Sequence, residues 1–348
     1  MEMEMTGIKR KSNLELLRIL AMVFIILIHL LSATGMTAFG AAIVGICNIG
    51  VSCFCLISGY FGIKFSMKKL LKMEIMMIML SLMETVALWI VFPQEMQGAA
   101  LLEQLAKSLF PFVSRKYWFY SCYICIFIFS DFIEKLISVL NKQEMKRLVL
   151  LLLLVFSVFP TLFYFEIMQD AGKGLIQMFM LYMVGRYIRL HWDIKINKIY
   201  ALAAIGILWT INTISLMYPL KVGSIVHSLC RDNSITNIAM AVLLLYIFKD
   251  IEFFSRGVNK FAKSMFAVFA LENAVVQIVA KLLGDNRFDV NNAVLGTLIL
   301  IGIVVAILMF CIIVGEIREL ICGKVEKRII AKVEELIPKR SIKKGYNE

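Results

Sequence analysis

The chain has 348 residues, of which 60% are hydrophobic and 18% are charged, and its mean hydropathy is +0.83. A water-soluble domain with this composition would expose far too much apolar surface, whereas about 20 apolar residues suffice for each membrane crossing. A soluble protein is therefore excluded. The net charge of +12 is compatible with nucleic-acid binding, but the basic residues lie between hydrophobic runs. Membrane topology explains them better, and no nucleic-acid partner is expected.

About ten apolar spans follow one another along the chain, which predicts an all-α, polytopic bundle in a lipid bilayer. The first of them is longer than the hydrophobic part of a signal peptide and lacks a convincing cleavage site, so it is expected to be retained. The ten spans lie near residues 14–34, 40–62, 73–92, 117–140, 148–166, 174–189, 199–218, 233–249, 264–282 and 291–314.

Basic residues collect in alternate loops between these spans. The richer loops contain residues such as Lys64, Lys142 and Arg186. Under the positive-inside rule, this asymmetry predicts an even number of spans with both termini in the cytoplasm.

Two domains are expected: a transmembrane domain over residues 1–314 and a basic cytoplasmic tail over residues 315–348. Apolar residues of the tail are spaced as one stripe among lysines and glutamates, which predicts an amphipathic helix on the membrane surface. Anchoring or contact with a partner is a more natural role for this tail than chemistry. The stripe consists of Val325, Ile329, Ile330, Val333, Leu336 and Ile337.

The first span contains two ionisable residues, Arg18 and His29, which are eleven positions apart. In an α-helix this spacing rotates the side chains by about 20° and separates them by roughly 16 Å, so both lie on one face. Ionisable groups are costly in lipid and commonly line a pathway or a site. For each residue alone a simpler interpretation stays open, in which Arg18 reaches the headgroups and His29 hydrogen-bonds a neighbouring helix.

Other polar or thiol groups carry weaker signals. Cys53, Cys55, Cys122 and Cys125 lie among apolar neighbours, where thiols behave as small hydrophobic side chains, and no metal site is expected. The motifs of zinc metalloproteases, phosphate-binding loops and serine hydrolases do not occur. His191 and His227 fall in predicted loops as ordinary surface histidines, although His227 could face an external substrate.

Six fragments in order resemble the acyltransferase-3 family of integral membrane acyltransferases, in particular its bacterial polysaccharide-modifying branch. The first pairs an arginine with a histidine after ten intervening residues, and the second ends in Ser-Gly-Tyr-Phe. The third is rich in aromatic residues, and the fourth contains Tyr-x-x-Gly-Arg. The six fragments are Asn13–Arg18 with His29, Gly50–Phe61, Tyr117–Tyr123, Leu181–Ile188, Arg231–Ser234 leading to Lys249, and Val258–Ser264.

This resemblance implies transfer of an acyl group, most often acetyl, from cytoplasmic acyl-CoA to a hydroxyl of a cell-surface or lipid-linked carbohydrate. It places the chain in the inner membrane of a bacterial cell, with acyl-CoA as donor substrate and without a metal. A neutral histidine suits removal of a proton from the attacking hydroxyl, so His29 is the expected base. Glu84 and Glu272 are carboxylates inside apolar spans, and either could orient His29 or receive the sugar.

Binding roles are assigned by chemistry. Arg18 presents a fork of donors suited to the phosphates of coenzyme A. Lys68, Lys69 and Lys72 could extend this basic entrance, although a loop obeying the positive-inside rule would look the same. Trp118, Tyr120 and Tyr123 could stack on a sugar ring, and an aromatic belt at the membrane boundary explains them equally well.

Three departures from the family pattern stand out. Ser52 occupies a position that commonly holds Asp or Asn, and Asp131 follows the aromatic stretch where Pro is common. The ninth span usually carries Tyr-Leu-Ile-His, whereas here Phe269–Asn273 reads Phe-Ala-Leu-Glu-Asn. Glu272 is therefore expected either to replace that histidine or to accompany an altered way of handling the substrate.

Two alternatives do not require a thioester. A transporter or flippase for a lipid-linked sugar would explain many helices with buried charge, but no internal repeat of the usual kind is apparent. A polysaccharide polymerase would also span the membrane many times, but the sequence has no dominant external loop. Ser58 and Gly59 are expected to allow close helix packing rather than catalysis.

Overall fold

The computed structural model describes residues 11–34, 37–164, 166–222, 225–284 and 293–336, and each predicted apolar span is helical there. This confirms the all-α prediction. The described part also contains two short helices outside the predicted spans, α5 (Ala99–Leu109) and α12 (Arg256–Lys263), and one short hairpin, β1 (Leu220–Val222) paired with β2 (Ile225–His227). The helices are α1 (Ser12–Thr34), α2 (Ala38–Cys47), α3 (Gly50–Phe61), α4 (Met67–Val91), α5 (Ala99–Leu109), α6 (Trp118–Val139), α7 (Lys142–Leu153), a π-helical turn (Leu154–Val158), α8 (Phe159–Phe163), α9 (Leu175–His191), α10 (Lys198–Met217), α11 (Ile235–Lys249), α12 (Arg256–Lys263), α13 (Met265–Leu283) and α14 (Ala293–Leu336).

Among the described residues, seven helical stretches are long and apolar enough to cross a membrane. Three predicted spans fall short of that standard. Helices α9 and α11 have 17 and 15 residues, and α6 contains Asp131, Glu134 and Lys135. Large apolar side chains such as Ile199 and Leu298 are exposed on the outer helices, as expected for contact with lipid. The chain is a membrane protein, and the count of ten crossings stays a prediction.

The second predicted span is interrupted rather than continuous. Helix α2 ends at Cys47, and α3 begins at Gly50. Asn48 at the break donates its side-chain Nδ2 to the carbonyl oxygen of Cys230 over 2.8 Å. Gly50 lies directly against α1, since a Cβ atom there would come within 2.7 Å of the Ala21 carbonyl oxygen. The break therefore brings α3 against α1 and fixes the loop before α11.

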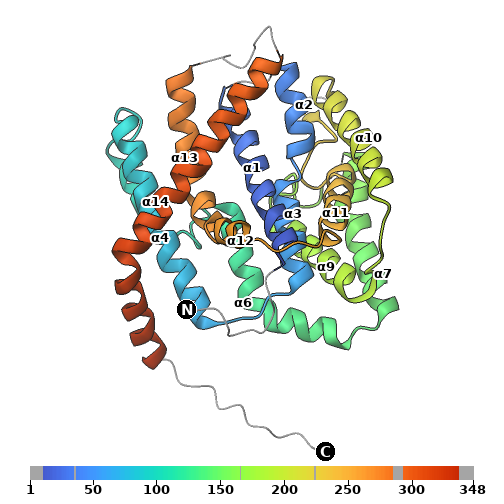
Figure 1. The fold of residues 1–348 in the computed structure, drawn as a ribbon, viewed down its shortest axis with the longest axis horizontal. Coiled ribbons are helices and arrows are strands. Elements are labelled where there is room, and N and C mark those ends of the chain that lie inside the picture. Colours follow the sequence, from blue (N-terminus) through green and yellow to red (C-terminus); the bar gives the residue numbers. More distant parts are fainter. Residues whose placement is uncertain (1–10, 35–36, 165, 223–224, 285–292, 337–348) are drawn as a thin grey trace, which may run out of the picture.

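Helix α1 runs through the middle of the bundle and packs against α2, α3, α12 and α13 (Figure 1). Its first half contributes Leu14 and Leu17 to an apolar core shared with α3, α9 and α11. Its second half contributes Met22 and Ile26 to a second core shared with α4, α13 and α14. The central helix thus joins two packing units, with Arg18 in the half that packs into the first and His29 in the half that packs into the second.

Helices α3 and α9 are in closest contact at two glycines. A Cβ atom at Gly59 would lie 2.2 Å from the carbonyl oxygen of Tyr182, and one at Gly185 would lie 2.4 Å from that of Leu56. Small residues permit such approach between helices in membranes. The packing interpretation of Gly59 agrees with this geometry, and the Gly in the Tyr-x-x-Gly-Arg fragment is its counterpart.

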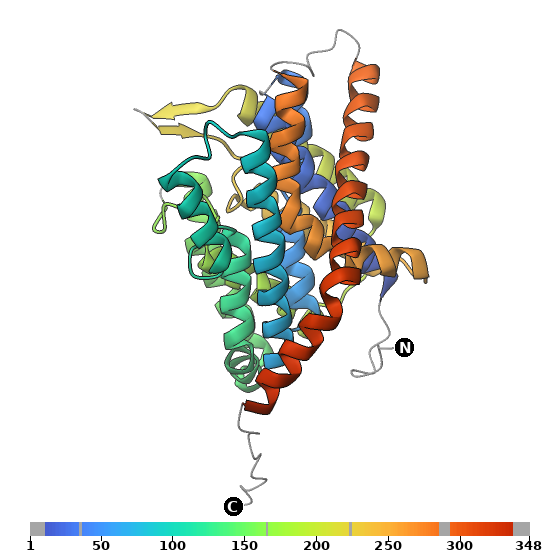
Figure 2. The ribbon, with the colours of Figure 1, turned by 90° about the vertical axis from the view of Figure 1, so that its left-hand side faces the viewer.

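Helix α14 has 44 residues, which corresponds to about 66 Å, whereas the hydrocarbon layer of a bilayer is about 30 Å thick. It runs along one side of the molecule and packs against α13 and α4 (Figure 2). The helix passes without a break through residue 315, where a separate tail was expected. Its distal part contacts α4, where Lys68 Nζ lies 3.6 Å from Glu334 Oε2. Ile337, the end of the predicted stripe, lies outside the described residues.

Candidate active site

His29 and Glu272 meet between α1 and α13. His29 Nδ1 lies 2.8 Å from Glu272 Oε1 and 2.9 Å from Oε2. The carboxylate is almost completely buried, with 2% of its side chain exposed, whereas 42% of the histidine side chain is exposed. Of the two carboxylates that were expected to orient His29, Glu272 is the one that contacts it.

The geometry sets the protonation pattern of the imidazole. An ionised carboxylate can only accept hydrogen bonds, so a neutral His29 ring that donates to Glu272 carries its proton on Nδ1. The other ring nitrogen, Nε2, then has a free lone pair. Because the histidine is the exposed member of the pair, this arrangement presents a base to an incoming molecule while the buried glutamate holds the ring.

Two charged residues in the loops influence His29 at longer range. Asp232 and Lys173 both lie within electrostatic range of the imidazole. The backbone of Asn233 is in direct contact with Gly172, where a Cβ atom would come within 2.5 Å of the Asn233 nitrogen. The loop before α9 and the loop before α11 are therefore joined to each other, within electrostatic range of the histidine.

Arg18 lies on the same face of α1 and is paired with Glu15, with 2.6 Å between Nη1 and Oε2. Its side chain remains 26% exposed, and a guanidinium has five N–H donors, so one carboxylate does not saturate it. Met22 and Ile25 lie between Arg18 and His29 on this face, and both are buried. The arginine and the histidine are consequently exposed at two separate places, with an apolar barrier between them.

The beginning of α1 is anchored by side chains from the first family-like fragment. Asn13 Nδ2 donates to the carbonyl oxygens of Phe248 and Lys249 at 2.9 and 3.0 Å. Ser12 Oγ donates to Asn259 Oδ1 over 3.1 Å. These contacts join the start of α1 to the end of α11 and to α12, and thereby fix the level of Arg18.

Glu84 has a different set of partners. Lys116 Nζ lies 3.1 Å from its Oε2, and the hydroxyl of Tyr117 donates to the same carboxylate. Lys116 also donates to Thr85 Oγ1 and Ser108 Oγ over 2.7 and 2.9 Å. The ring of Tyr117 packs 6.1 Å from that of Phe269, one helical turn from Glu272. Glu84 thus belongs to a polar cluster that lies beside the histidine pair and supplies its carboxylate with two partners.

The remaining predicted binding residues are spread over α4 and α6. Lys69 and Lys72 are exposed at the start of α4, beside the Lys68–Glu334 contact. Tyr120 is 1% exposed, and its hydroxyl donates to Glu74, so its ring presents no free face. Trp118 contacts Phe119 edge to face, and Tyr123 stacks against Phe119 with 6.4 Å between the ring centroids.

The structure shows the surroundings of two residues that depart from the family pattern. Ser52 is buried in α3, and Asp131 Oδ1 accepts a long 3.4 Å hydrogen bond from the Phe65 nitrogen. All eight cysteines are free thiols. In the described part of the chain, His, Cys, Asp and Glu side chains form no cluster of three or more suited to a metal ion.

Two groups of polar residues were not identified from the sequence. One is Lys116, whose buried partner Glu84 lies 32 positions away in the sequence on another helix, so no local pattern reveals the pair. The other group is Asp170, Gln177 and Asn233, which line a pocket at the loops before α9 and α11. An isolated glutamine at the start of an apolar helix was the available signal for it.

Residues 11–315 match a family model whose description is an acyltransferase domain. Comparison with curated proteins and comparison with solved structures each gave no significant match. The matched segment begins just before the Asn13–Arg18 fragment and covers all six family-like fragments. Together with the apolar helices, this match establishes that the chain belongs to the acyltransferase-3 family and is a membrane acyltransferase.

Proposed function

We propose that the protein transfers an acyl group, in the simplest case acetyl, from cytoplasmic acyl-CoA to a hydroxyl group of a cell-surface or lipid-linked carbohydrate. The single observation that carries this proposal is the contact between His29 Nδ1 and the buried Glu272 carboxylate. A histidine that is oriented by a buried carboxylate and exposed at its other ring nitrogen is suited to remove the proton of a hydroxyl group.

The proposed reaction proceeds by attack of the acceptor oxygen on the thioester carbonyl carbon. The hydroxyl proton moves to Nε2 of His29 as the new C–O bond forms, and Glu272 stabilises the resulting imidazolium. When the tetrahedral intermediate collapses, the C–S bond breaks and the imidazolium returns the proton to the leaving thiolate. The products are an ester and free coenzyme A.

Arg18 is proposed to bind a phosphate of coenzyme A, with Lys68, Lys69 and Lys72 adding positive charge at the same membrane face. The roughly 16 Å between Arg18 and His29 along α1 is a distance that an extended pantetheine arm spans. Met22 and Ile25 lie between these two residues, so the arm must displace them or pass beside them. Trp118 and Tyr123 remain candidates for contact with the substrate, whereas Glu84 is proposed to have a structural role in its cluster with Lys116 and Tyr117.

The test is a transfer assay with purified protein, labelled acetyl-CoA and a glycan extract, in which both free coenzyme A and labelled glycan are measured. His29→Ala is expected to lower kcat by at least about a hundredfold, the scale of a general base, with nearly normal affinity for acetyl-CoA. His191→Ala is the matched control, because His191 lies at the far end of α9, and it should keep its activity. Near-native turnover of His29→Ala contradicts this mechanism.

The transporter alternative predicts a different outcome in the same preparation. Reconstituted vesicles would move a lipid-linked sugar between leaflets without consuming acetyl-CoA. Release of coenzyme A that depends on the glycan supports the acyltransferase proposal and opposes the transporter.

Both termini are proposed to be cytoplasmic in the bacterial inner membrane. The loop after α4 and the turn after α6 lie at opposite ends of the bundle (Figure 1), and Gln97 and Asn141 are exposed there. An impermeant thiol reagent should label Gln97→Cys in intact cells and should not label Asn141→Cys. The reverse pattern would place Arg18 on the wrong side for acyl-CoA.

A further inference from the structure

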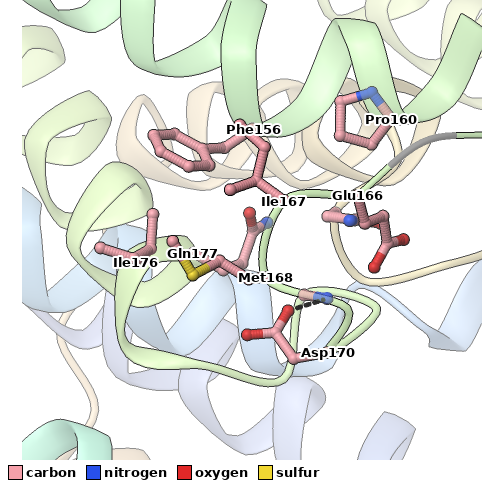
Figure 3. Close-up of a pocket in the computed structure, with 10 residues that line it drawn as sticks. Phe156, Pro160, Glu166, Ile167, Met168, Asp170, Ile176 and Gln177 are labelled. Atoms are coloured by element: carbon pink, nitrogen blue, oxygen red, sulfur yellow. Dashed lines mark hydrogen bonds between the residues drawn. The ribbon is translucent and has the colours of Figure 1, made fainter. Parts of the chain in front are cut away.

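A pocket lies beside the loop that precedes α9. It is open to solvent on one side, and about 290 Å³ of space, part of it open solvent, lies between the π-helical turn, α8, the loop and the first turn of α9. Phe156, Pro160 and Ile176 form its apolar wall. Figure 3 shows Phe156 and Pro160 on one side and Asp170 on the opposite side, with Gln177 between them.

Two side-chain oxygens at this pocket have no partner in the described structure. Gln177 Oε1 and Asn233 Oδ1 are both buried without a hydrogen bond, and the two residues are only 6% and 5% exposed. The orientation of the Gln177 amide is fixed, because its Nε2 donates to the Asp232 carbonyl oxygen over 3.0 Å. Buried acceptors without donors are unfavourable, so a ligand that supplies hydroxyl groups would satisfy them.

Two carboxylates complete the polar side of the pocket. Glu166 is held by Arg231 and accepts a 2.9 Å hydrogen bond from the Ala171 nitrogen. Asp170 Oδ1 accepts one of the same length from the Gly172 nitrogen. The pocket therefore offers oxygen acceptors on one side and an apolar wall on the other. This combination suits a pyranose ring, which has hydroxyl donors at its edge and C–H groups on its faces.

The backbone around the pocket is held in unusual conformations. Tyr164, Gln169 and Ala171 have positive φ values of 55°, 51° and 53°, which cost energy for residues other than glycine. Phe156 belongs to a π-helical turn, and such turns occur frequently at functional sites. Pro160 has no N–H to donate to the carbonyl of Phe156 four residues earlier, which accounts for the altered turn.

The pocket adjoins the loop before α11, which contains Asp232 and Asn233. Asp232, which directly precedes Asn233, lies within electrostatic range of both His29 and Asp170. We propose that this pocket is a subsite for one sugar ring of a carbohydrate, held by Gln177, Asn233 and Asp170 against Phe156. Its assignment to the acceptor rests on the proposed function, whereas binding of a sugar does not.

Binding is tested without acyl-CoA, by saturation-transfer difference NMR on the purified protein with methyl glycosides of hexoses, 6-deoxyhexoses and N-acetylhexosamines. At least one glycoside should give a signal with the native chain. Asn233→Leu removes one unpartnered acceptor, and Ile176→Trp fills the pocket while both acceptors stay in place. Each variant should lose most of the signal. Gln143→Leu removes an exposed glutamine at the start of α7 and should keep it.

Three outcomes overturn the proposal: no signal with any glycoside, an unchanged signal in both pocket variants, or a signal with ethanolamine alone, which would indicate an ammonium site. The transfer assay separates the two proposals. If the glycoside signal is lost in Ile176→Trp but native protein never consumes acetyl-CoA, the sugar subsite stands and the acyltransferase mechanism fails. If Ile176→Trp keeps its native KM for the glycan in active protein, the pocket is not the acceptor subsite.

Discussion

Glu84 and Glu272 look alike in the sequence, since each is a lone carboxylate inside an apolar helix, but the structure gives them different surroundings. Glu84 is enclosed by Lys116, Tyr117 and the hydroxyls that share the lysine. Among the described residues, Glu272 is hydrogen-bonded to His29 alone, and 42% of the His29 side chain is exposed. The two carboxylates are also close enough to repel each other.

This difference separates a structural role from a chemical one. A buried charge whose partners are all buried has nothing left to offer a substrate, and its loss leaves those partners unsatisfied. A buried carboxylate that orients an exposed imidazole changes how that imidazole reacts with a substrate. We therefore expect mutations at the two sites to affect different measured quantities.

The largest effect is expected from Lys116→Met. It leaves the Glu84 carboxylate buried without its ammonium partner, and breaking one side of a buried pair costs about 3–5 kcal/mol. The free energy of unfolding in detergent should fall by that amount, while kcat per folded molecule stays near native. The double variant Lys116→Met with Glu84→Gln should recover part of the stability. A native-like unfolding free energy for Lys116→Met would show that the cluster is not a structural element.

Glu272→Gln should produce the opposite pattern. The amide can still hydrogen-bond His29 Nδ1, but it cannot stabilise an imidazolium, so kcat should fall by about tenfold or more with little change in unfolding. Glu272→His should keep part of the activity. Turnover in the transfer assay, normalised to folded protein, distinguishes the cases. Native turnover in both variants would make Glu272 as inert as we expect Glu84 to be.

A smaller effect is expected at Arg18, the residue proposed to bind acyl-CoA. Arg18→Ala removes charge-assisted hydrogen bonds made in ground and transition states alike, which corresponds to an increase in the apparent KM for acetyl-CoA of about tenfold at unchanged kcat. Arg18→Lys should restore part of the loss. An equal fall in kcat would instead assign Arg18 to the chemical step.

The smallest effect is expected at Asp193, a half-exposed carboxylate whose Oδ1 lies 2.7 Å from Nζ of the buried Lys249. The hydrogen bond from the Lys249 ammonium lowers the pKa of the Asp193 carboxyl. A lowered folded pKa adds stability that is present above the unfolded value of about 3.9 and is lost as the pH falls through the folded value. Asp193→Asn should weaken this acid dependence slightly. A large loss of stability at neutral pH would contradict this, because Asp193 is half exposed and Lys249 keeps Asp250 as a second partner.

The sequence was sufficient for the helices and for one side of the site. Long apolar runs predict helices because lipid demands internal hydrogen bonds, and this held for all ten predicted spans. Arg18 and His29 were recognised because their spacing places them on one face of a single helix. Helical periodicity within one segment carries this information without knowledge of the fold.

Contacts between distant segments were not predictable in the same way. Nothing in the spacing of Glu84 and Glu272 says which of them meets His29, since both lie on other helices. The pocket depends on Asn233 and Gln177 being 56 positions apart in sequence and joined through Asp232. Their unsatisfied oxygens become visible only when all neighbouring donors are placed.

The interlocked glycines of α3 and α9 restrict how this molecule can move. With backbone against backbone at Gly59 and Gly185, these helices have no side-chain layer across which to slide, so they behave as one rigid plate. The contacts between α1 and α13 are instead made through side chains such as Met22 and Leu271, and we expect these to rearrange more easily when a long thioester enters. The helix that carries Glu272 is therefore expected to be more mobile than the plate formed by α3 and α9.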